Sequence, residues 1–415
     1  MQQEQMEVRK QRGYEIAKTS RIEKTDKGWK VPSQSGGGHY IVVSNGFGAE
    51  CNCPDHELRK CKCKHIWAVE LIVTHEIDQE GNITITKTIR KTYSQDWKNY
   101  NLAQQKEKEM FMQLLANITK NIRQPAYNHG RPTNPLSDTI YSMVFKVYST
   151  FSGRRFASDM QTSKENGFIE KRIPYNSMFD YFKKKELTPL LAQIVQITSL
   201  PLATIEHNFA IDSTGFGTNQ FQRWYSFKHG KEINSRRWVK CHFITGTKSN
   251  IITSVKVTSE FDNDCPQLPE LVQQTAENFD MQEVSADKAY LSRDNMNVIK
   301  QAGALPFIPF KSNSTDRADG SYMWKKMYHY FMLNNEEFLQ HYHKRSNVET
   351  SVHMIKSKFG DCVRSKDWIA QINEVLCKII CHNICVVIQE MHELGINPNF
   401  CPKSDEVARN VGLSE

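Results

Sequence analysis

Two aspartates in the C-terminal half of the chain each follow a short apolar run. Asp212 ends the run Phe-Ala-Ile-Asp, and Asp287 ends the run Val-Ser-Ala-Asp. Such runs predict buried strands, and a carboxylate at a strand C-terminus faces the crevice where α/β sheets bind their ligands. Two carboxylates on neighbouring strands can bridge divalent cations ~3.5–4 Å apart, the arrangement for in-line phosphoryl displacement. Because Mg²⁺ takes oxygen ligands and keeps several waters, one further carboxylate would complete the site.

Glu349 is the candidate for that third carboxylate. It belongs to four residues separated by three, four and seven positions: Tyr342, Arg345, Glu349 and Lys356. At about 100° per residue, all four fall on one narrow face of a helix. This face suits a metal and a phosphate backbone, with Glu349 on the metal and Arg345 and Lys356 on phosphates. The alternative is a solvated charge stripe, which explains any single acidic residue better but not the three together.

The combined pattern resembles the insertion-sequence-four group of prokaryotic DDE transposases. The four helix residues resemble the Tyr-Arg-Glu-Lys signature of that group, and the segments 210–215 and 286–290 resemble its two Asp motifs. Two shorter segments add to the likeness: Lys240-Cys-His242 and His382-Asn383. The resemblance covers roughly residues 135–390. Its combined motif is specific, whereas the Asp segments alone would be weak.

The resemblance implies a fold and residue roles. The catalytic domain would be α/β with the ribonuclease-H-like fold, and an inserted segment at about 305–335, largely β in relatives, would precede the last acidic helix. The triad that binds catalytic Mg²⁺ or Mn²⁺ would be Asp212, Asp287 and Glu349. The DNA contacts on the same helix would be Tyr342, Arg345 and Lys356.

A second cluster of potential metal ligands lies near the N-terminus. Five such residues fall within 15 positions: Cys51, Cys53, Cys61, Cys63 and His65. A Cys-x-Cys pair on an extended strand points both sulfurs to one side. Four N/S donors satisfy tetrahedral Zn²⁺ and leave no position for water. We therefore expect a structural zinc site at Cys51, Cys53, Cys63 and His65. Cys61 could replace Cys63, and free thiols are the alternative.

The surroundings of this cluster carry a second resemblance. A hairpin is predicted at 28–43 and a short helix follows the last histidine, so the Cys-x-Cys…Cys-x-His arrangement resembles the ββα SWIM zinc finger over about residues 35–72. This likeness implies binding of DNA or protein. The module is not part of the usual pattern of the transposase group.

A basic and aromatic stretch follows the first aspartate. Residues 222–256 carry eight Lys or Arg against one acidic residue, a mixture that can neutralise phosphates and stack on unpaired bases. Three arginines are candidates for DNA contacts: Arg223, Arg236 and Arg237. The alternative is a solvated hairpin whose aromatic side chains pack in the core.

Composition narrows the class of protein. The 415 residues carry a net charge of +8, which favours a polyanionic partner without demanding one. The polar N-terminus does not resemble a secretory signal, and the longest apolar run, 379–388, is too short to span a bilayer. We therefore expect neither a membrane protein nor a secreted one. Eleven cysteines in such a chain predict reduced thiols or metal ligands.

The elements predicted from the sequence divide the chain into four parts. A zinc module at 1–75 precedes a connector and helical region for DNA binding or assembly at 76–200. The catalytic domain follows at 205–395, and a tail at 396–415 ends the chain. Strands are expected at 209–212, 238–246, 251–258 and 283–287.

The resulting hypothesis is a DDE transposase that cuts transposon ends and transfers the strands into target DNA. By resemblance it would act on terminal inverted repeats as a homodimer, in the prokaryotic cytoplasm near the nucleoid. One alternative is a catalytically inactive, transposase-derived DNA-binding regulator, against which the intact triad argues. Another is a ribonuclease-H-like hydrolytic nuclease, which would not need the Tyr-Arg-Glu-Lys face.

Overall fold

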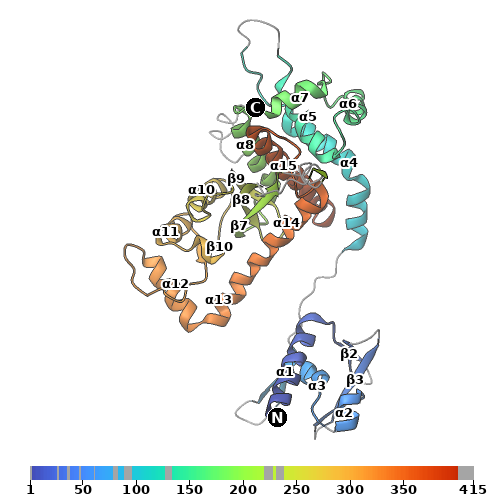
Figure 1. Cartoon of the computed structure of the whole chain (residues 1–415), viewed down its shortest axis with the longest axis vertical. Coiled ribbons are helices and arrows are strands. Elements are labelled where there is room, and N and C mark those ends of the chain that lie inside the picture. The colour runs from blue at the N-terminus through green and yellow to red at the C-terminus, as the bar shows by residue number, and fades with distance from the viewer. Residues whose placement is uncertain are drawn as a thin grey trace. The chain divides into compact units, whose positions relative to one another are not determined.

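A computed structural model describes ten stretches of the chain: 2–25, 28–34, 38–45, 48–59, 61–77, 83–87, 96–126, 133–218, 228–229 and 238–400. The chain divides into two compact units, Met1–Ser94 and Gln95–Glu415 (Figure 1). The predicted DNA contacts Arg223, Arg236 and Arg237 and the predicted C-terminal tail beyond residue 400 lie outside the described residues.

The N-terminal unit is built on an antiparallel sheet of order β1-β2-β3-β4. Its strands are β1 (Glu23–Thr25), β2 (Gly28–Pro32), β3 (His39–Asn45) and β4 (Gly48–Cys51). β2 and β3 confirm the predicted hairpin, with Trp29 opposite Val42. The other elements are α1 (Gln2–Thr19), α2 (Pro54–Arg59), α3 (Lys64–Ile72) and the paired strands β5 (Val73–Ile77) and β6 (Ile83–Lys87).

Helix α1 is an element that the sequence did not predict. Its residues are mostly polar, so no apolar stripe marks it as a helix. Packing against α3 explains it: Ile16 is fully buried, and a Cβ at Gly13 would lie 2.6 Å from the Cβ of Trp67. Glycine is therefore needed at this crossing, because no side chain fits between the two helices.

The C-terminal unit contains a mixed sheet of order β11-β10-β7-β8-β9. β7, β8 and β9 are antiparallel neighbours, whereas β10 and β11 run parallel to β7. The strands are β7 (Asn208–Gly217), β8 (Trp238–Gly246), β9 (Ile252–Ser259), β10 (Glu283–Ala286) and β11 (Leu305–Phe307). The four predicted strands are confirmed, although β7 extends five residues beyond its predicted end.

Helices cover both faces of this sheet (Figure 1). One face packs against α10 (Leu268–Ala276), α11 (Arg293–Gln301), α12 (Tyr322–Leu333) and α13 (Asn335–Tyr342). The other packs against α14 (Ser346–Phe359), α15 (Trp368–Glu393) and an all-helical part. That part comprises α4 (Trp97–Thr119), α5 (Leu136–Ser149), α6 (Phe156–Glu165), α7 (Tyr175–Phe182) and α8 (Leu187–Ser199). Alternate residues of β7 point to opposite faces of the sheet, so Ala210 packs into the core on one face and Ile211 into the core on the other.

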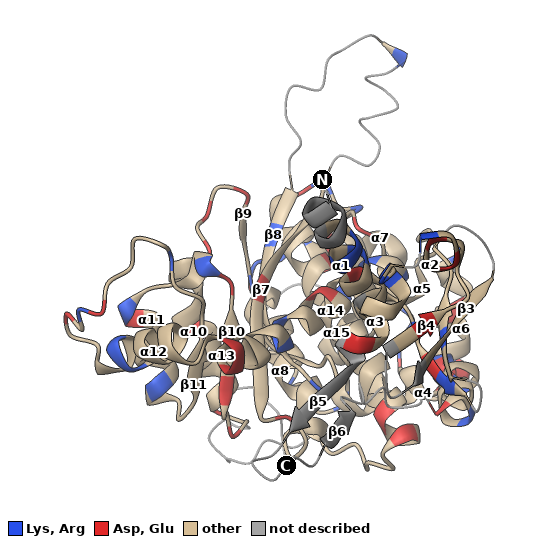
Figure 2. Cartoon of the chain, turned by 90° about the horizontal axis from the view of Figure 1, so that it is seen from below, with Lys and Arg blue, Asp and Glu red and all other residues tan. Residues whose placement is uncertain are grey.

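The inserted segment differs from the expectation that it is largely β. After the three-residue strand β11 it is helical, forming α12 and α13. The reason is the spacing of its aromatic residues: Trp324, Tyr328 and Phe331 all contact the ring of Phe310. Steps of four and three residues match a helix face, not a strand. Figure 2 shows basic residues, both lysines, on α12 and acidic residues, both glutamates, on the following α13.

The long helix α15 is the central element of the larger core. By length and composition it could cross a membrane, but 89% of its most apolar stretch is buried inside the structure, as in the core helix of a globular fold.

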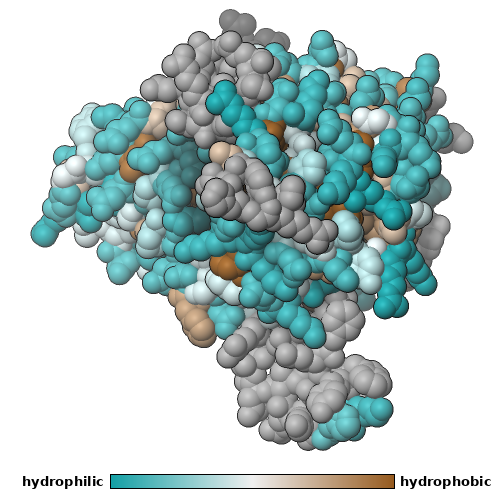
Figure 3. Space-filling view, turned by 90° about the horizontal axis from the view of Figure 1, so that it is seen from above, coloured by the Kyte–Doolittle hydropathy of each residue, from teal (hydrophilic) through white to brown (hydrophobic). Residues whose placement is uncertain are grey.

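Cys377 and Cys381 are fully buried on α15, so they pack as small hydrophobic residues. Figure 3 shows a mostly hydrophilic outer face with small, separate apolar patches.

Candidate active site

The two predicted strand aspartates lie on adjacent strands. In the parallel pairing of β10 with β7, Ala286 is opposite Ile211, so Asp287 and Asp212 each follow a paired residue. Asp212 does not end its strand, contrary to the prediction, because β8 continues to pair with β7 as far as Gly217. β10 stops at Ala286, which leaves the β10 side of Asp212 open. The two carboxylates therefore share one edge of the sheet.

Asp212 is held by two hydrogen bonds. Its Oδ2 accepts from Nη2 of Arg345 at 2.9 Å, and its Oδ1 accepts from the backbone N–H of Ser213 at 2.9 Å. Burial raises the pKa of Asp212 above its ordinary value, and the nearby charges of Asp287 and Asp264 add to that rise, while Arg345 opposes it. Burial is the largest cause of this rise, and a bound cation would oppose it by favouring the charged form of the carboxylate.

The predicted helix face is present, but it spans three helical segments. Tyr342 ends α13, Arg345 ends the 3₁₀ turn η4 (His343–Arg345), and Glu349 lies in the first turn of α14. An acidic residue there is favoured by the helix dipole. Nη1 of Arg345 lies 3.8 Å from Oε1 of Glu349, so one guanidinium links the first and third predicted carboxylates. The Glu349 side chain is 72% exposed and free to reorient toward a cation.

Lys356 lies apart from these carboxylates. It is seven residues beyond Glu349, about 10 Å along the helix, and its Nζ is 5.6 Å from the ring of Phe216 near the end of β7. Burial lowers the pKa of Lys356. The structure therefore brings Asp212, Glu349 and Arg345 together but leaves Lys356 at the far end of the same helix, suited to a neighbouring phosphate.

A group beside Asp212 was missed by the sequence analysis. Oδ1 of Asp264 forms an ion pair with Nζ of Lys240 at 2.8 Å and lies 3.2 Å from Nδ1 of His242. On β8, His242 is opposite Ser213, the neighbour of Asp212. Burial lowers the pKa of His242 to about 4, so this imidazole is neutral at pH 7. The Lys240-Cys-His242 segment was noticed in the sequence as part of the family likeness. Asp264 follows a polar turn, and nothing in the sequence there indicated a functional residue.

The described part of the basic stretch is largely paired within the protein. Lys240 binds Asp264, and Lys256 forms an ion pair with Glu270. These two cations are therefore less available to DNA phosphates than their sequence suggested. The guanidinium of Arg345, by contrast, keeps a buried Nε that has no hydrogen-bond partner among the described residues.

The N-terminal cysteine cluster assembles into a compact group of donors. The ligand atoms of Cys51, Cys53, Cys63 and His65 all lie within 4.8 Å of one another, and all four residues are buried. Cys61 is outside this group, with its Sγ 4.0 Å from the carbonyl oxygen of Asp55.

The donor set of this cluster fits zinc. Nδ1 of His65 lies 3.8 Å from Sγ of Cys51 and 3.9 Å from Sγ of Cys63, and its Nε2 is buried without a hydrogen-bond partner among the described residues. A hydrogen bond from Cys51 lowers the pKa of Cys63, while the same hydrogen bond raises the pKa of Cys51 and burial raises that of Cys53. Bound Zn²⁺ would favour the thiolate form of all three. Three sulfurs and one nitrogen match the tetrahedral preference of Zn²⁺.

The carboxylate site lies within a recognised family region. Residues 206–384 match the family model described as transposase DDE domain. The match supports a DDE transposase, a class that uses divalent metals. The matched DDE region contains the five-stranded sheet, the inserted helices, α14 and most of α15. The N-terminal unit and α4–α8 lie outside it.

The chain also shows a weak similarity to a solved structure. It is the piggyBac transposase in its synaptic complex with hairpin DNA, with 11% sequence identity over 73% of this chain and 76% of that chain, at a TM-score of 0.33. A TM-score of this size does not establish a common fold.

Proposed function

We propose that the chain is a DDE transposase of the insertion-sequence-four group, which cleaves transposon ends and transfers the strands into target DNA. The observation that carries the proposal is the position of Asp212 and Asp287 on adjacent parallel strands, with Glu349 joined to Asp212 through Arg345. All of these residues belong to the region that matches the transposase DDE domain.

The sheet supports a ribonuclease-H-like catalytic domain. Three antiparallel strands in chain order, β7 to β9, are followed by β10 and β11, which add in parallel on the other side of β7. In this topology the first strand is central, so its carboxylate meets that of the fourth strand at one edge. A helix that crosses this edge, here α14 with η4, can then supply the third carboxylate.

The proposed roles follow from the contacts of each side chain. Asp212, Asp287 and Glu349 would hold Mg²⁺ or Mn²⁺, which would supply activation of water or of a 3′-hydroxyl and neutralisation of charge on the phosphate. Arg345 now neutralises Asp212; once a cation does so, its guanidinium becomes available to a phosphate oxygen. Lys356 would bind a phosphate further along the strand, and Tyr342 would contact DNA beside the carboxylates. No covalent protein–DNA intermediate is needed, so no Ser or Tyr nucleophile takes part.

The N-terminal unit would serve recognition rather than chemistry. We propose that Cys51, Cys53, Cys63 and His65 hold a structural zinc in a SWIM-type module, and that this module and helices α4–α8 recognise terminal inverted repeats or assist assembly. Two transposon ends must be held together, so a homodimer in the DNA complex is part of the proposal. Its place in the cell would be the cytoplasm, with the nucleoid.

The decisive experiment uses DNA that flanks the gene. End-labelled fragments are incubated with the purified chain and Mg²⁺, alongside Asp212→Asn and a matched control, Asp294→Asn, whose carboxylate is exposed on α11. We expect cuts at an inverted repeat that leave a 3′-hydroxyl, a loss of at least about 1,000-fold in Asp212→Asn, and no change in the control.

Three other outcomes would contradict parts of this proposal. Sequence-indifferent nicking would identify a hydrolytic nuclease instead. Tight binding without cleavage, in protein that is folded and loaded with zinc, would identify an inactive DNA-binding regulator. Cleavage retained by Asp212→Asn would refute the assignment of the triad.

A further inference from the structure

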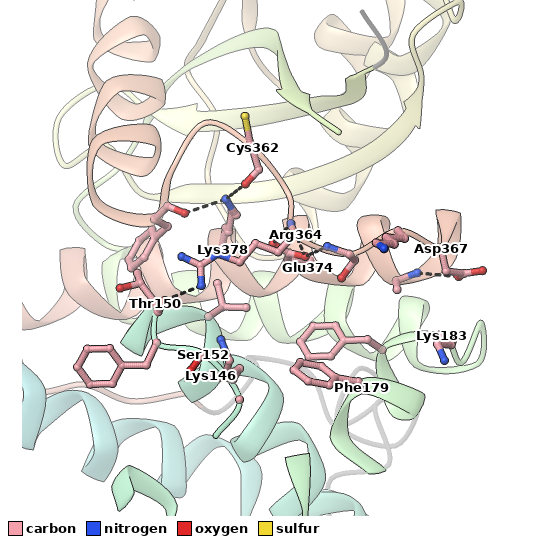
Figure 4. Close-up of a pocket in the computed structure, with 18 residues that line it drawn as sticks. Lys146, Thr150, Ser152, Phe179, Lys183, Cys362, Arg364, Asp367, Glu374 and Lys378 are labelled. Carbon is pink, nitrogen blue, oxygen red and sulfur yellow. Dashed lines mark hydrogen bonds between the residues drawn. The ribbon is translucent and has the colours of Figure 1, made fainter. Parts of the chain in front are cut away.

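A cavity of about 850 Å³ opens in the C-terminal unit, away from the carboxylates. Its walls are the end of α5, the turn at 150–153, α7, and the segment from the end of α14 into α15 (Figure 4). This volume falls within the range of small-molecule and cofactor sites. The proposed reaction does not use it, so it needs an explanation of its own.

Positive charge dominates the lining. Five cations line it: Lys146, Lys183, Arg364, Lys366 and Lys378. Three of them already have partners in the protein: Lys378 donates to backbone carbonyls, Arg364 donates to the carbonyl oxygen of Thr150, and Lys183 pairs with Asp180. Two carboxylates, Asp367 and Glu374, also line the cavity, and both already accept hydrogen bonds from backbone N–H groups. Glu374 accepts from Arg364 and Ser365, and Asp367 caps the first turn of α15. The cavity therefore favours a ligand that carries negative charge or many acceptors.

Lys378, at 2% exposed, is the deepest of these cations, but its Nζ already donates to three backbone carbonyls. Lys146 is the next deepest. It is only 7% exposed, and among the described residues its amino group has no hydrogen bond or ion pair. Burial lowers its pKa to about 8, so it is still mainly protonated at pH 7. An ammonium that is nearly buried without a partner is unfavourable. A ligand atom that accepts from Nζ within the cavity would relieve this cost.

Aromatic rings provide the apolar part of the site. Phe151 and Phe179 are 47% and 41% exposed, and both line the cavity with the buried Phe182 and Phe359. A Cβ at Gly153 would lie 3.0 Å from the ring of Phe179, so glycine there allows the ring its position. Partly exposed rings beside cations are the combination on which unpaired bases stack.

The cavity lies at the end of two elements that carry predicted carboxylates, β7 with Asp212 and α14 with Glu349. Along α14, Glu349 and Phe359 are about 15 Å apart, and Lys356 lies between them. The backbone of Gly217, at the end of β7, hydrogen-bonds to Asp361 and Val363, beside the cavity. A DNA strand bound at Asp212 and at Lys356 would therefore continue toward the cavity.

We propose that this cavity binds one unpaired nucleotide of the DNA substrate. The base enters among the phenylalanine rings, and the exposed cations Lys183, Arg364 and Lys366 bind the flanking phosphates. Lys146 donates to the base edge. Because an ammonium only donates and guanine presents the adjacent acceptors O6 and N7, the site prefers guanine. This inference rests on the proposed function for the identity of the polymer, and the same chemistry would fit a free nucleotide.

The test measures binding without cleavage. Fluorescein-labelled ten-nucleotide single strands of thymidine, with one central guanosine or cytidine, are titrated into full-length Asp212→Asn without added Mg²⁺. We expect the guanosine strand to bind about tenfold more tightly. Lys146→Met should abolish that preference, and Phe179→Ala should weaken both strands by about tenfold. The control Lys164→Met, an exposed lysine on α6, should keep the preference.

Each result then decides the matter. Equal preference in Lys146→Met and Lys164→Met, both folded by thermal melting, would overturn the proposal, as would unchanged binding by Phe179→Ala. Displacement of the strand by guanosine monophosphate at similar concentrations would overturn the DNA assignment in favour of a free nucleotide. A guanine preference that persists in a chain unable to cleave any DNA would overturn the proposed function and leave the cavity's role intact.

Discussion

The two candidate metal centres differ in how far the protein has assembled them. The Cys/His cluster brings its four buried donors within 4.8 Å from residues close in sequence. The carboxylate site takes its groups from β7, the end of β10 and α14, and Arg345 occupies the space between Asp212 and Glu349. A closed, buried donor set suits a structural ion. A set held by a displaceable guanidinium suits an ion that arrives with substrate.

The largest effect should come from breaking the first of these centres. Cys51→Ser with Cys53→Ser should unfold the N-terminal unit, because structural zinc contributes ~10–16 kcal/mol of apparent folding free energy in small modules. The C-terminal unit should keep its own melting transition. Zinc content and limited proteolysis measure this, with Cys61→Ser as the control outside the cluster. A double variant that still binds one zinc would show that the ligand set is wrong.

Acid should act on the C-terminal unit through its buried histidines. Burial lowers the pKa of His242, and that of His382, to about 4, below the value in the unfolded chain. The unfolded state therefore binds more protons, and stability is lost as pH falls from about 6.5 to about 4, by about 3 kcal/mol per histidine. His242→Gln should remove about half of this loss in denaturant titrations at pH 7 and pH 4.5. An unchanged pH dependence would contradict the assignment to His242.

Arg345→Met sharpens the contrast between the two centres. Removing the guanidinium leaves Asp212 partly buried beside Asp287 and Asp264, which should cost about 1–3 kcal/mol of unfolding free energy at pH 7. The pKa of Asp212 should rise further, because the charge of Arg345 lowers it more than any other group does. Added Mg²⁺ should then raise the melting temperature more in the variant than in the unchanged chain. Equal stabilisation of both proteins would mean that Arg345 and the cation do not compete.

The smallest expected effect concerns Lys356. Because it lies about 10 Å along the helix from Glu349, Lys356→Met should leave metal binding intact and remove one phosphate contact. The dependence of log affinity on log salt should fall in slope by about one, for DNA of any sequence. Lys358→Met is not a suitable control, because that lysine pairs with Glu107; Lys164→Met on α6 is. A slope equal to that of the control would exclude a phosphate contact.

Most of the correct predictions came from the spacing of residues that are close together in the sequence. The four predicted strands, the hairpin at β2 and β3, and the common face of Tyr342, Arg345 and Glu349 all depend on neighbours within a few residues, where periodicity reports which side is buried. The prediction that the inserted segment is largely β was wrong because it came from relatives. The spacing of the segment's own aromatic residues is that of a helix. Helix α1 was not predicted because its polar sequence shows no apolar stripe. Its packing on α3 is what stabilises it.

The sequence by itself determined which residues could do chemistry and how each lies on its own element. Only the tertiary structure decided the partners: Arg345 reaches Asp212 across 133 positions, Asp264 joins Lys240 and His242, and Lys146 faces a cavity closed by residues more than 200 positions later. The physical reason is that a helix or strand fixes the relative directions of side chains only among residues that are close in sequence. Contacts between distant segments depend instead on how complete faces pack, which no local pattern specifies.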